Sequence, residues 1–395
     1  MNYEFAHRMS GLQASAIREI LKFTADPSVI SFAAGNPAPE AFPVEAVEKI
    51  TEDILRKNPI GALQYSISEG YTPLRDKLKS YLKERNNIGQ DFDELIITSG
   101  AQQGIEIACK VMCNPGDTVI CENPSFVGSL NAFKSFDVNL VGVDVEADGI
   151  SVEGLEEALK ENPNTKLVYL IPNFQNPTGI TMSLEKRMAC YELCKKYGAI
   201  ILEDNPYGEL RFSGNDVPTI KSLDTDGIVI YCGSFSKVLS PGLRVGYSYA
   251  CKELIQKMVV CKQVSDVHTN ILGQMICYEF MANYDFAEHI KKLQEIYRNK
   301  CNLMLDCLSK HLNPKISYTH PEGGLFIWCT LPENVNMMEF CKRAVQNKVA
   351  VVPGNAFLPS EEYKTQSFRL NFSTPTDEQI IKGIEILGEL THDII

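Results

Sequence analysis

The central part of the sequence alternates short apolar segments with helix-like patterns, and this alternation limits the possible fold more than any other feature. Residues 183–197 are typical of a helix, with Ser183 as N-cap and Gly198 as C-cap. Repeated strand–helix–strand units predict a mainly parallel sheet that carries helices on both faces. The apolar segments that we expect to form its strands are 95–98, 118–121, 166–171, 199–203, 228–231 and 245–250.

The two ends of the sequence follow a different pattern. Residues 13–23 favour a helix, and a strip rich in Pro, Gly and Ala follows it. Near the C-terminus a long helical pattern at about 285–312 leads into short strands and further helices. We therefore expect a large domain over 45–284 and a smaller α+β domain built from 1–44 and 285–395, with the long helix as the bridge.

Composition excludes several functional classes. A net charge of −12 and a pI of about 5.1 argue against nucleic acid and anionic membranes as partners. No segment reaches the roughly 18 apolar residues that span a bilayer. The 13 cysteines form no C-x-x-C pair, and the histidines lack metal-binding spacing, so we expect no metal site and a reducing, cytoplasmic location.

The segment "YCGSFSKVLSPGLRVGY" places a concentration of hydrogen-bond donors directly after one expected strand. In open α/β sheets, ligands bind at the carboxyl ends of strands. A lysine such as Lys237, held near other cations, can lose its proton and form a Schiff base, while Ser234, Ser236 and Arg244 can hold a phosphate dianion. With the carboxylate of Asp204 at a neighbouring strand end to keep a pyridine nitrogen protonated, this is the arrangement that pyridoxal phosphate requires.

Several motifs follow one another in an order that identifies a family. The sequence contains "SGAQQGIE", "NPTG", "EDNPYGEL", "PEGGLFIW", "VPGNAF" and "SFRLNFS". Together with the lysine segment, they resemble the class I/II aminotransferases, which are fold type I pyridoxal-phosphate enzymes with a mainly parallel, seven-stranded sheet. "LQYSISEGYTPLR" and "VPGNAF" are most similar to the 2-aminoadipate and kynurenine aminotransferase branch. The resemblance implies a homodimer that moves an amino group from an L-amino acid to a 2-oxo acid, with 2-oxoglutarate as the expected acceptor, by a ping-pong mechanism.

The resemblance also implies roles for single residues around the cofactor ring. Lys237 would form the Schiff base and then transfer the proton of the substrate Cα. Asp204 would pair with the pyridinium nitrogen, while Tyr207 and Asn176 would hydrogen-bond the phenolic oxygen of the ring. Phe126 would stack on the ring face, where many relatives carry Tyr.

A second group of residues is implied for the phosphate and the substrate. The expected phosphate ligands are Ala101 and Gln102 through their backbone N–H groups, and Ser234, Ser236 and Arg244. Relatives often carry Ser in place of Ala101. Tyr65 would reach the phosphate from the neighbouring subunit. Arg369 would bind the substrate α-carboxylate, with Gly35 and Asn176 beside it.

Two alternatives use the same sequence features. A β-lyase or a cyclising lyase would use the same cofactor site. The effector domain of a transcription regulator would carry a DNA-binding module ahead of the family-like sequence, which here begins near the N-terminus and leaves no room for one. Substrate choice stays open, because Arg18 could meet an acidic donor such as 2-aminoadipate or be a solvated helix residue.

Overall fold

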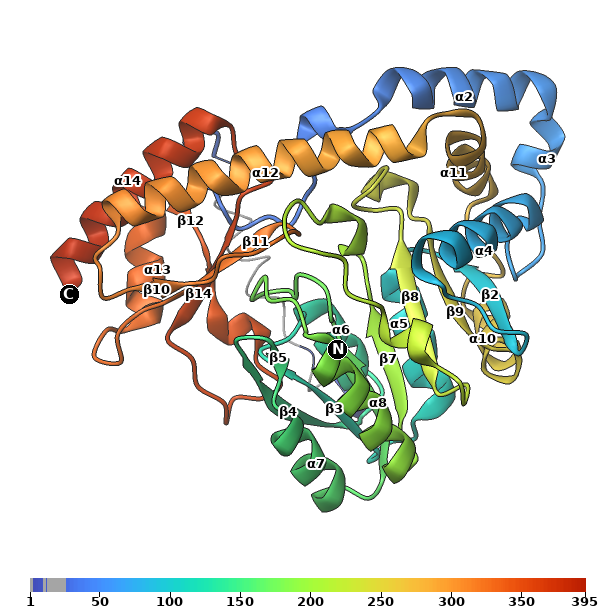
Figure 1. The fold of residues 1–395 in the computed structure, drawn as a ribbon, viewed down its shortest axis with the longest axis horizontal. Helices are drawn as coiled ribbons and strands as arrows, with labels where there is room; N and C mark the ends of the chain where they lie inside the picture. The colour runs from blue at the N-terminus through green and yellow to red at the C-terminus, as the bar shows by residue number, and fades with distance from the viewer. Residues whose placement is uncertain (1–2, 10–11, 13–25) are drawn as a thin grey trace.

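A large twisted sheet forms the centre of the computed structural model, which describes residues 3–9, 12 and 26–395. Its eight strands run in the order β2-β9-β8-β7-β6-β3-β4-β5. Helices cover both of its faces, which confirms the predicted fold class (Figure 1). The strands are β2 (Asp93–Thr98), β3 (Thr118–Asn123), β4 (Asn139–Glu146), β5 (Gly149–Ile150), β6 (Thr165–Leu170), β7 (Ile200–Asp204), β8 (Val229–Ser234) and β9 (Gly246–Cys251).

The strand directions bring several strand ends to one edge of the sheet. Pairing is parallel from β4 through β3, β6 and β7 to β8. Only β9, antiparallel to both β2 and β8, and the two-residue β5, antiparallel to β4, depart from this direction. The carboxyl ends of β2, β3, β6, β7 and β8 therefore share an edge with the start of β9. Every strand predicted by residue number is present, and β5 adds an eighth, very short strand to the predicted seven.

Alternate residues of each strand pack against different helices. Val119 and Tyr169 belong to a buried cluster with α5 (Ala101–Met112), α6 (Val127–Lys134) and α10 (Lys252–Ser265). Their chain neighbours Ile120 and Val168 pack on the other face against α7 (Val152–Glu161) and α8 (Leu184–Tyr197). The predicted caps of α8 are confirmed: the Ser183 hydroxyl accepts the Lys186 N–H, and Gly198 is left-handed with φ 73°.

A second, four-stranded antiparallel sheet lies toward the C-terminus, in the order β10-β11-β14-β13. The N-terminal strip joins it, because the Phe32 N–H donates to the Ala350 oxygen at 2.8 Å and the Phe32 oxygen accepts the Asn371 N–H at 2.9 Å. The predicted division at 44/45 and 284/285 stays a prediction. The strands of this sheet are β10 (Ser317–Tyr318), β11 (Phe326–Thr330), β13 (Val352–Pro353) and β14 (Ser367–Asn371), while β1 (Ile30–Ser31) and β12 (Val349–Ala350) form a separate parallel pair.

The predicted long helix is α12 (Phe286–His311), which crosses the top of the molecule in Figure 1 from α11 to α14. In the ranges that the structure describes, no helix is long and apolar enough to cross a membrane. The predicted helix at 13–23 and Arg18 lie outside the described residues. The other helices are α2 (Val44–Lys57), α3 (Pro59–Leu63), α4 (Thr72–Asn86), α9 (Ile220–Leu223), α11 (Ile271–Asn283), α13 (Met337–Gln346) and α14 (Asp377–Ile394).

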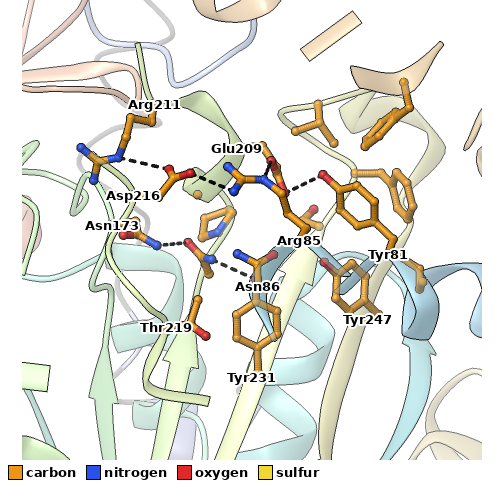
Figure 2. Close-up of a pocket in the computed structure, with 18 of the residues that line it drawn as sticks. Tyr81, Arg85, Asn86, Asn173, Glu209, Arg211, Asp216, Thr219, Tyr231 and Tyr247 are labelled. Carbon is orange, nitrogen blue, oxygen red and sulfur yellow. Dashed lines mark hydrogen bonds and ion pairs between the residues drawn. The ribbon is translucent and has the colours of Figure 1, made fainter. Parts of the chain in front are cut away.

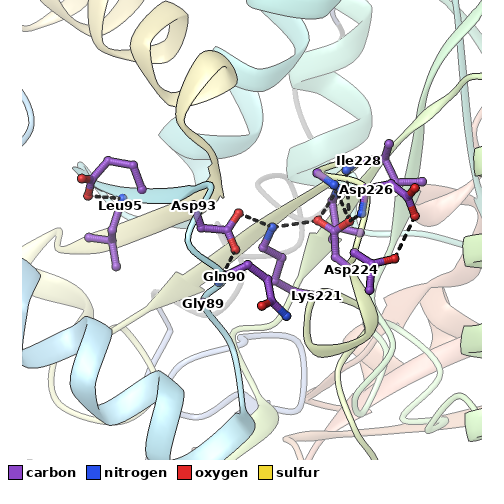
Figure 3. A network of polar contacts seen from close by, with 12 residues as sticks. Gly89, Gln90, Asp93, Leu95, Lys221, Asp224, Asp226 and Ile228 are labelled. Carbon is purple, nitrogen blue, oxygen red and sulfur yellow. Dashed lines mark hydrogen bonds and ion pairs between the residues drawn. The ribbon is translucent and has the colours of Figure 1, made fainter.

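A buried ion network fixes the opposite edge of the large sheet (Figure 3). The ammonium of Lys221, which is fully buried, lies 2.8 Å from both Asp93 and Asp224. The second oxygen of Asp224 accepts the Gly227 N–H at 2.8 Å. Since Asp93 begins β2 and Gly227 precedes β8, the network ties the starts of these two strands together and lies away from the strand ends where ligands bind.

Candidate active site

Lys237 follows the carboxyl end of β8, and its amine meets the N-terminal strip. The ammonium donates to the Gly35 oxygen at 2.6 Å. Burial, helped by the positive charges of Arg369 and Arg244, lowers the pKa of Lys237 to about 8. About a tenth of this amine is therefore unprotonated and nucleophilic at pH 7, far more than for a solvated lysine.

Asp204, the last residue of β7, presents a carboxylate oxygen that has no partner. Its Oδ2 accepts the Tyr169 hydroxyl at 2.7 Å, while its Oδ1 is buried without a hydrogen bond from any described residue. Burial raises the pKa of Asp204 to about 7. A buried acceptor without a partner is unfavourable unless a ligand supplies a donor, and a protonated ring nitrogen is such a donor.

Arg369 in β14 is a buried cation held by neutral groups. Its Nη1 donates to Asn176 Oδ1 and its Nη2 to the Ala33 oxygen, both at 2.8 Å. The guanidinium lies 4.1 Å and 4.9 Å from the ring centres of Phe326 and Phe357, and its Nε has no partner among the described residues. Burial lowers the pKa of Arg369 to about 10, so it stays charged at neutral pH. It is suited to a ligand carboxylate.

Asn176 connects this cation to Tyr207. The Asn176 amide nitrogen lies 3.4 Å from the Tyr207 hydroxyl, and burial raises the pKa of this phenol. Tyr207 follows Asp204 by three residues, so the end of β7 and the turn after it supply a carboxylate and a phenol.

The predicted phosphate ligands meet where α5 begins. Arg244, itself left-handed with φ 53°, lies 3.5 Å from the Ser236 hydroxyl, and the Ser234 hydroxyl accepts the Ser236 N–H at 3.0 Å. Gly100 has φ +80°, and a Cβ there would lie 2.3 Å from the Arg244 guanidinium. Only glycine lets the backbone approach this closely.

The first turn of α5 adds backbone donors to this group. The N–H groups of Ala101 and Gln102 occupy the positions where helices leave donors without intrahelical partners. The Gln102 side chain donates to the Gly128 oxygen at 3.0 Å and so ties α5 to α6. Phe126, half-buried, is the residue just before α6.

Tyr65 is the one predicted residue that the described chain does not bring into this cluster. Its side chain is 81% exposed and contacts His268 edge-on, with ring centres 5.9 Å apart. Its predicted role in the neighbouring subunit stays a prediction.

Sequence reasoning missed several groups that line the cluster. Phe326 and Phe357 stand in the quoted motifs "PEGGLFIW" and "VPGNAF", which could have suggested them as stacking partners of Arg369. Nothing in the sequence indicated that the Ala33 oxygen would accept a hydrogen bond from Arg369. Tyr169 is an aromatic residue inside an apolar strand, and only the structure places its hydroxyl against Asp204.

A separate cavity lies beside the cluster, between α4, residues 205–219 and β8 (Figure 2). Of the predicted site residues, only Ser234 lines it. Arg85 reaches Asp216 at 2.8 Å and Glu209 at 3.5 Å, and the Tyr81 hydroxyl donates to Glu209 at 2.8 Å. Because these charged side chains satisfy one another, we interpret the cavity as structural.

Comparisons with known proteins agree with this geometry. Residues 27–387 match the family model for aminotransferase class I and II. The chain is 41% identical to aromatic-amino-acid aminotransferase 1 of Thermococcus litoralis, over 98% of this chain and 94% of that protein. It is 38% identical to 2-aminoadipate transaminase of Thermus thermophilus, over 97% and 95% of the two chains.

A solved structure is equally similar. The kynurenine aminotransferase of Pyrococcus horikoshii, solved in complex with PMP, superposes with a TM-score of 0.95 at 38% identity, covering 98% of this chain and 97% of that one. The residues present fit such a cofactor, since Asp204 Oδ1 lacks a donor and Gly100 opens the start of α5 beside Arg244. The lyase and regulator alternatives are not favoured by these relatives. The chain therefore belongs to the aminotransferase class I and II family and is a pyridoxal-phosphate-dependent aminotransferase.

Proposed function

We propose that the enzyme moves an amino group from an L-amino acid to a 2-oxo acid, with 2-oxoglutarate as acceptor, in two half-reactions of a ping-pong cycle. The observation that carries this proposal is the amine of Lys237, which lies near two guanidinium groups and against a neutral carbonyl. An amine in these surroundings is available both to hold an aldehyde and to move a proton.

Bound pyridoxal phosphate supplies an aldehyde and an electron-withdrawing ring that makes a substrate Cα proton acidic. Lys237 would hold this group through its amine and would move the Cα proton of the substrate. Asp204 would accept the ring N–H through Oδ1. Tyr207 and Asn176 would hydrogen-bond the ring oxygen, and Phe126 would pack on the ring face.

Two sets of donors orient the anionic groups. Arg369 binds the substrate carboxylate through its free Nε, beside Gly35 and Asn176, and its contacts with the rings of Phe326 and Phe357 help to hold the guanidinium in place. The phosphate is held by the α5 N-terminus and the serine–arginine group, that is, by Ala101, Gln102, Ser234, Ser236 and Arg244.

The protein is proposed to be a homodimer in which Tyr65 completes the phosphate site of the partner. The exposed Tyr65 side chain supports this. A cytoplasmic location is also proposed, supported by thirteen cysteines that are all free thiols. Cell fractionation would test the location.

The Lys237→Ala variant tests the function directly. Borohydride reduction should trap no cofactor on the variant, and transamination should fall by about 10²–10⁴-fold because the proton carrier is lost. A Lys257→Ala variant, which changes an exposed lysine on α10, should keep both properties. A cofactor still fixed by borohydride in Lys237→Ala would contradict the assignment.

A panel of amino donors tests the substrate class. The relatives named above support aromatic amino acids, 2-aminoadipate and kynurenine as first candidates. Each donor is incubated with and without 2-oxoglutarate, and the oxo-acid product is measured after many turnovers. Product that accumulates without an acceptor would indicate a lyase instead.

A further inference from the structure

Asp204 is held by a relay of two hydroxyl groups that neither the sequence motifs nor the proposed function uses. The Ser129 hydroxyl donates to the Tyr169 oxygen at 2.8 Å, and the Tyr169 hydroxyl donates to Asp204 Oδ2 at 2.7 Å. All three side chains are buried. The Tyr169 ring is fixed by an edge contact with Phe133, with ring centres 5.3 Å apart.

The relay connects two parts of the proposed cofactor site. Ser129 lies in the first turn of α6, and its N–H donates to the Phe126 oxygen at 3.1 Å. Tyr169 stands on β6, between α6 and β7. The residue proposed for the ring face and the residue proposed for the ring nitrogen are therefore joined through buried side chains.

Among the described residues, no cation contributes to the pKa shift of Asp204. The titratable groups that interact with it are Tyr169 on β6, Glu122 on β3, Cys232 on β8 and Tyr207. Burial raises the pKa of Glu122 to about 8 and that of Cys232 to about 12, and it also raises the pKa of both phenols. At neutral pH, none of these groups supplies a positive charge to Asp204.

Burial raises the pKa of Asp204, and the Tyr169 hydrogen bond opposes that shift. A donor to an ionised carboxylate stabilises the charged form. It also occupies Oδ2 and so leaves Oδ1 for another donor.

We propose that Tyr169, oriented by Ser129, is a positioning residue that keeps Asp204 ionised and directs its Oδ1 toward the ring nitrogen of the cofactor. This inference rests on the proposed role of Asp204.

The Tyr169→Phe variant tests it, because the ring and its packing stay while the donor is lost. The pKa of Asp204 should rise, so that its carboxylate is protonated at a higher pH. Two quantities should show this: the affinity of the apoenzyme for pyridoxal phosphate and kcat/KM, each measured from pH 5 to 9. The acid limb of both profiles should move up by about one pH unit, with roughly tenfold weaker cofactor binding on that limb.

Three further variants separate the possible outcomes. Ser129→Ala should move the limb in the same direction by less, and it carries the test if Tyr169→Phe fails to fold. Tyr191→Phe removes another buried hydroxyl, bound 2.6 Å from Asp226, and should leave the limb in place. Asp204→Asn should abolish the limb.

The relay would be overturned if the acid limb of the pH profiles stayed in place in folded Tyr169→Phe or Ser129→Ala while Asp204→Asn lost it. The role of Asp204 would then stand. An unchanged profile in Asp204→Asn would instead contradict that role itself.

Discussion

Two buried acids near the ends of β3 and β7, which have β6 between them, show how differently a buried carboxyl can be held. Asp204 receives a phenol, whereas Glu122 Oε2 receives the Ile171 N–H at 2.9 Å and the Gln175 amide at 3.4 Å. Burial raises the pKa of Glu122 from 4.5 to about 8, so at neutral pH it is mostly uncharged. It therefore places no second full negative charge next to Asp204.

Glu122→Gln should make stability less dependent on pH. A group whose pKa is raised by folding stabilises the fold fully below its unfolded pKa, and this contribution is lost as the pH rises through the folded value. For Glu122 the loss runs from about 4.5 to about 8. The free energy of unfolding of Glu122→Gln, relative to wild type, should thus rise across this range by about 1–3 kcal/mol.

Urea unfolding of the apoenzyme at each pH from 5 to 9 measures this difference. Glu48→Gln, which changes an exposed residue on α2, is the control and should follow wild type. If the curves of Glu122→Gln and wild type stay parallel throughout, Glu122 does not titrate in this range.

At the scale of elements, the loop from β6 to α8 carries Asn176 and depends on one buried guanidinium. Arg187 on α8 donates to the Pro172 oxygen at 2.9 Å, the Met182 oxygen at 3.0 Å and Asn173 Oδ1 at 2.7 Å. It also donates to the Pro218 oxygen at 3.0 Å. Both ends of the loop are therefore fixed to the same side chain.

Arg187→Met should loosen this loop, because methionine fills much of the space but donates no hydrogen bond. Leaving several buried carbonyls unpaired should destabilise the protein by about 2–4 kcal/mol. Hydrogen exchange should accelerate at 173–182 more than in α14. Arg343→Met, which removes a surface pair with Asp393, should change stability by less than about 0.5 kcal/mol. Uniformly faster exchange would mean that Arg187 stabilises the whole domain rather than the loop.

The elements also show what a sequence can and cannot predict. Continuous apolar segments predicted β6, β7 and β8 from the sequence, because both faces of these strands are buried. No apolar run indicated β4, which has β3 on one side and only the two-residue β5 on the other, and in which only Val143 is buried. Helix α5 begins at Ala101, since Gly100 turns the chain just before it.

For the site, the ordered motifs predicted that Lys237, Asp204, Asn176 and Arg369 belong to one site, and the structure places these four residues in one cluster. The contacts of Arg369 with Ala33 and of Asp204 with Tyr169 join residues distant in sequence. Such contacts follow from sheet order and register, which local patterns do not fix.

At the scale of the whole molecule, exposed apolar side chains gather around α3. Ile60, Leu63 and Tyr65 are 73%, 74% and 81% exposed. Leu63 and Tyr65 line a surface groove together with His268 and Leu272. Exposed apolar side chains gathered in this way are typical of an interface between subunits.

Mixing two variants that are each impaired, Tyr65→Ala and Lys237→Ala, tests whether Tyr65 acts across that interface. Tyr65→Ala should lose about 10–100-fold in activity if it removes a contact to phosphate, and Lys237→Ala should be nearly inactive. In a mixed dimer, the subunit with intact Lys237 receives the intact Tyr65 of the other. When the variants are unfolded together and refolded in equal amounts, half of the dimers are mixed and each has one intact site. About a quarter of wild-type activity should return.

The control mixes Lys237→Ala with the double variant Lys237→Ala/Tyr65→Ala, in which no subunit keeps the lysine, so nothing should return. If Tyr65 served its own subunit, the first mixture would also stay at the sum of its parts, because the only lysine present would lack its tyrosine. Sedimentation of each mixture shows whether dimers have re-formed. Recovery in the first mixture alone therefore requires both a dimer and a tyrosine shared across it.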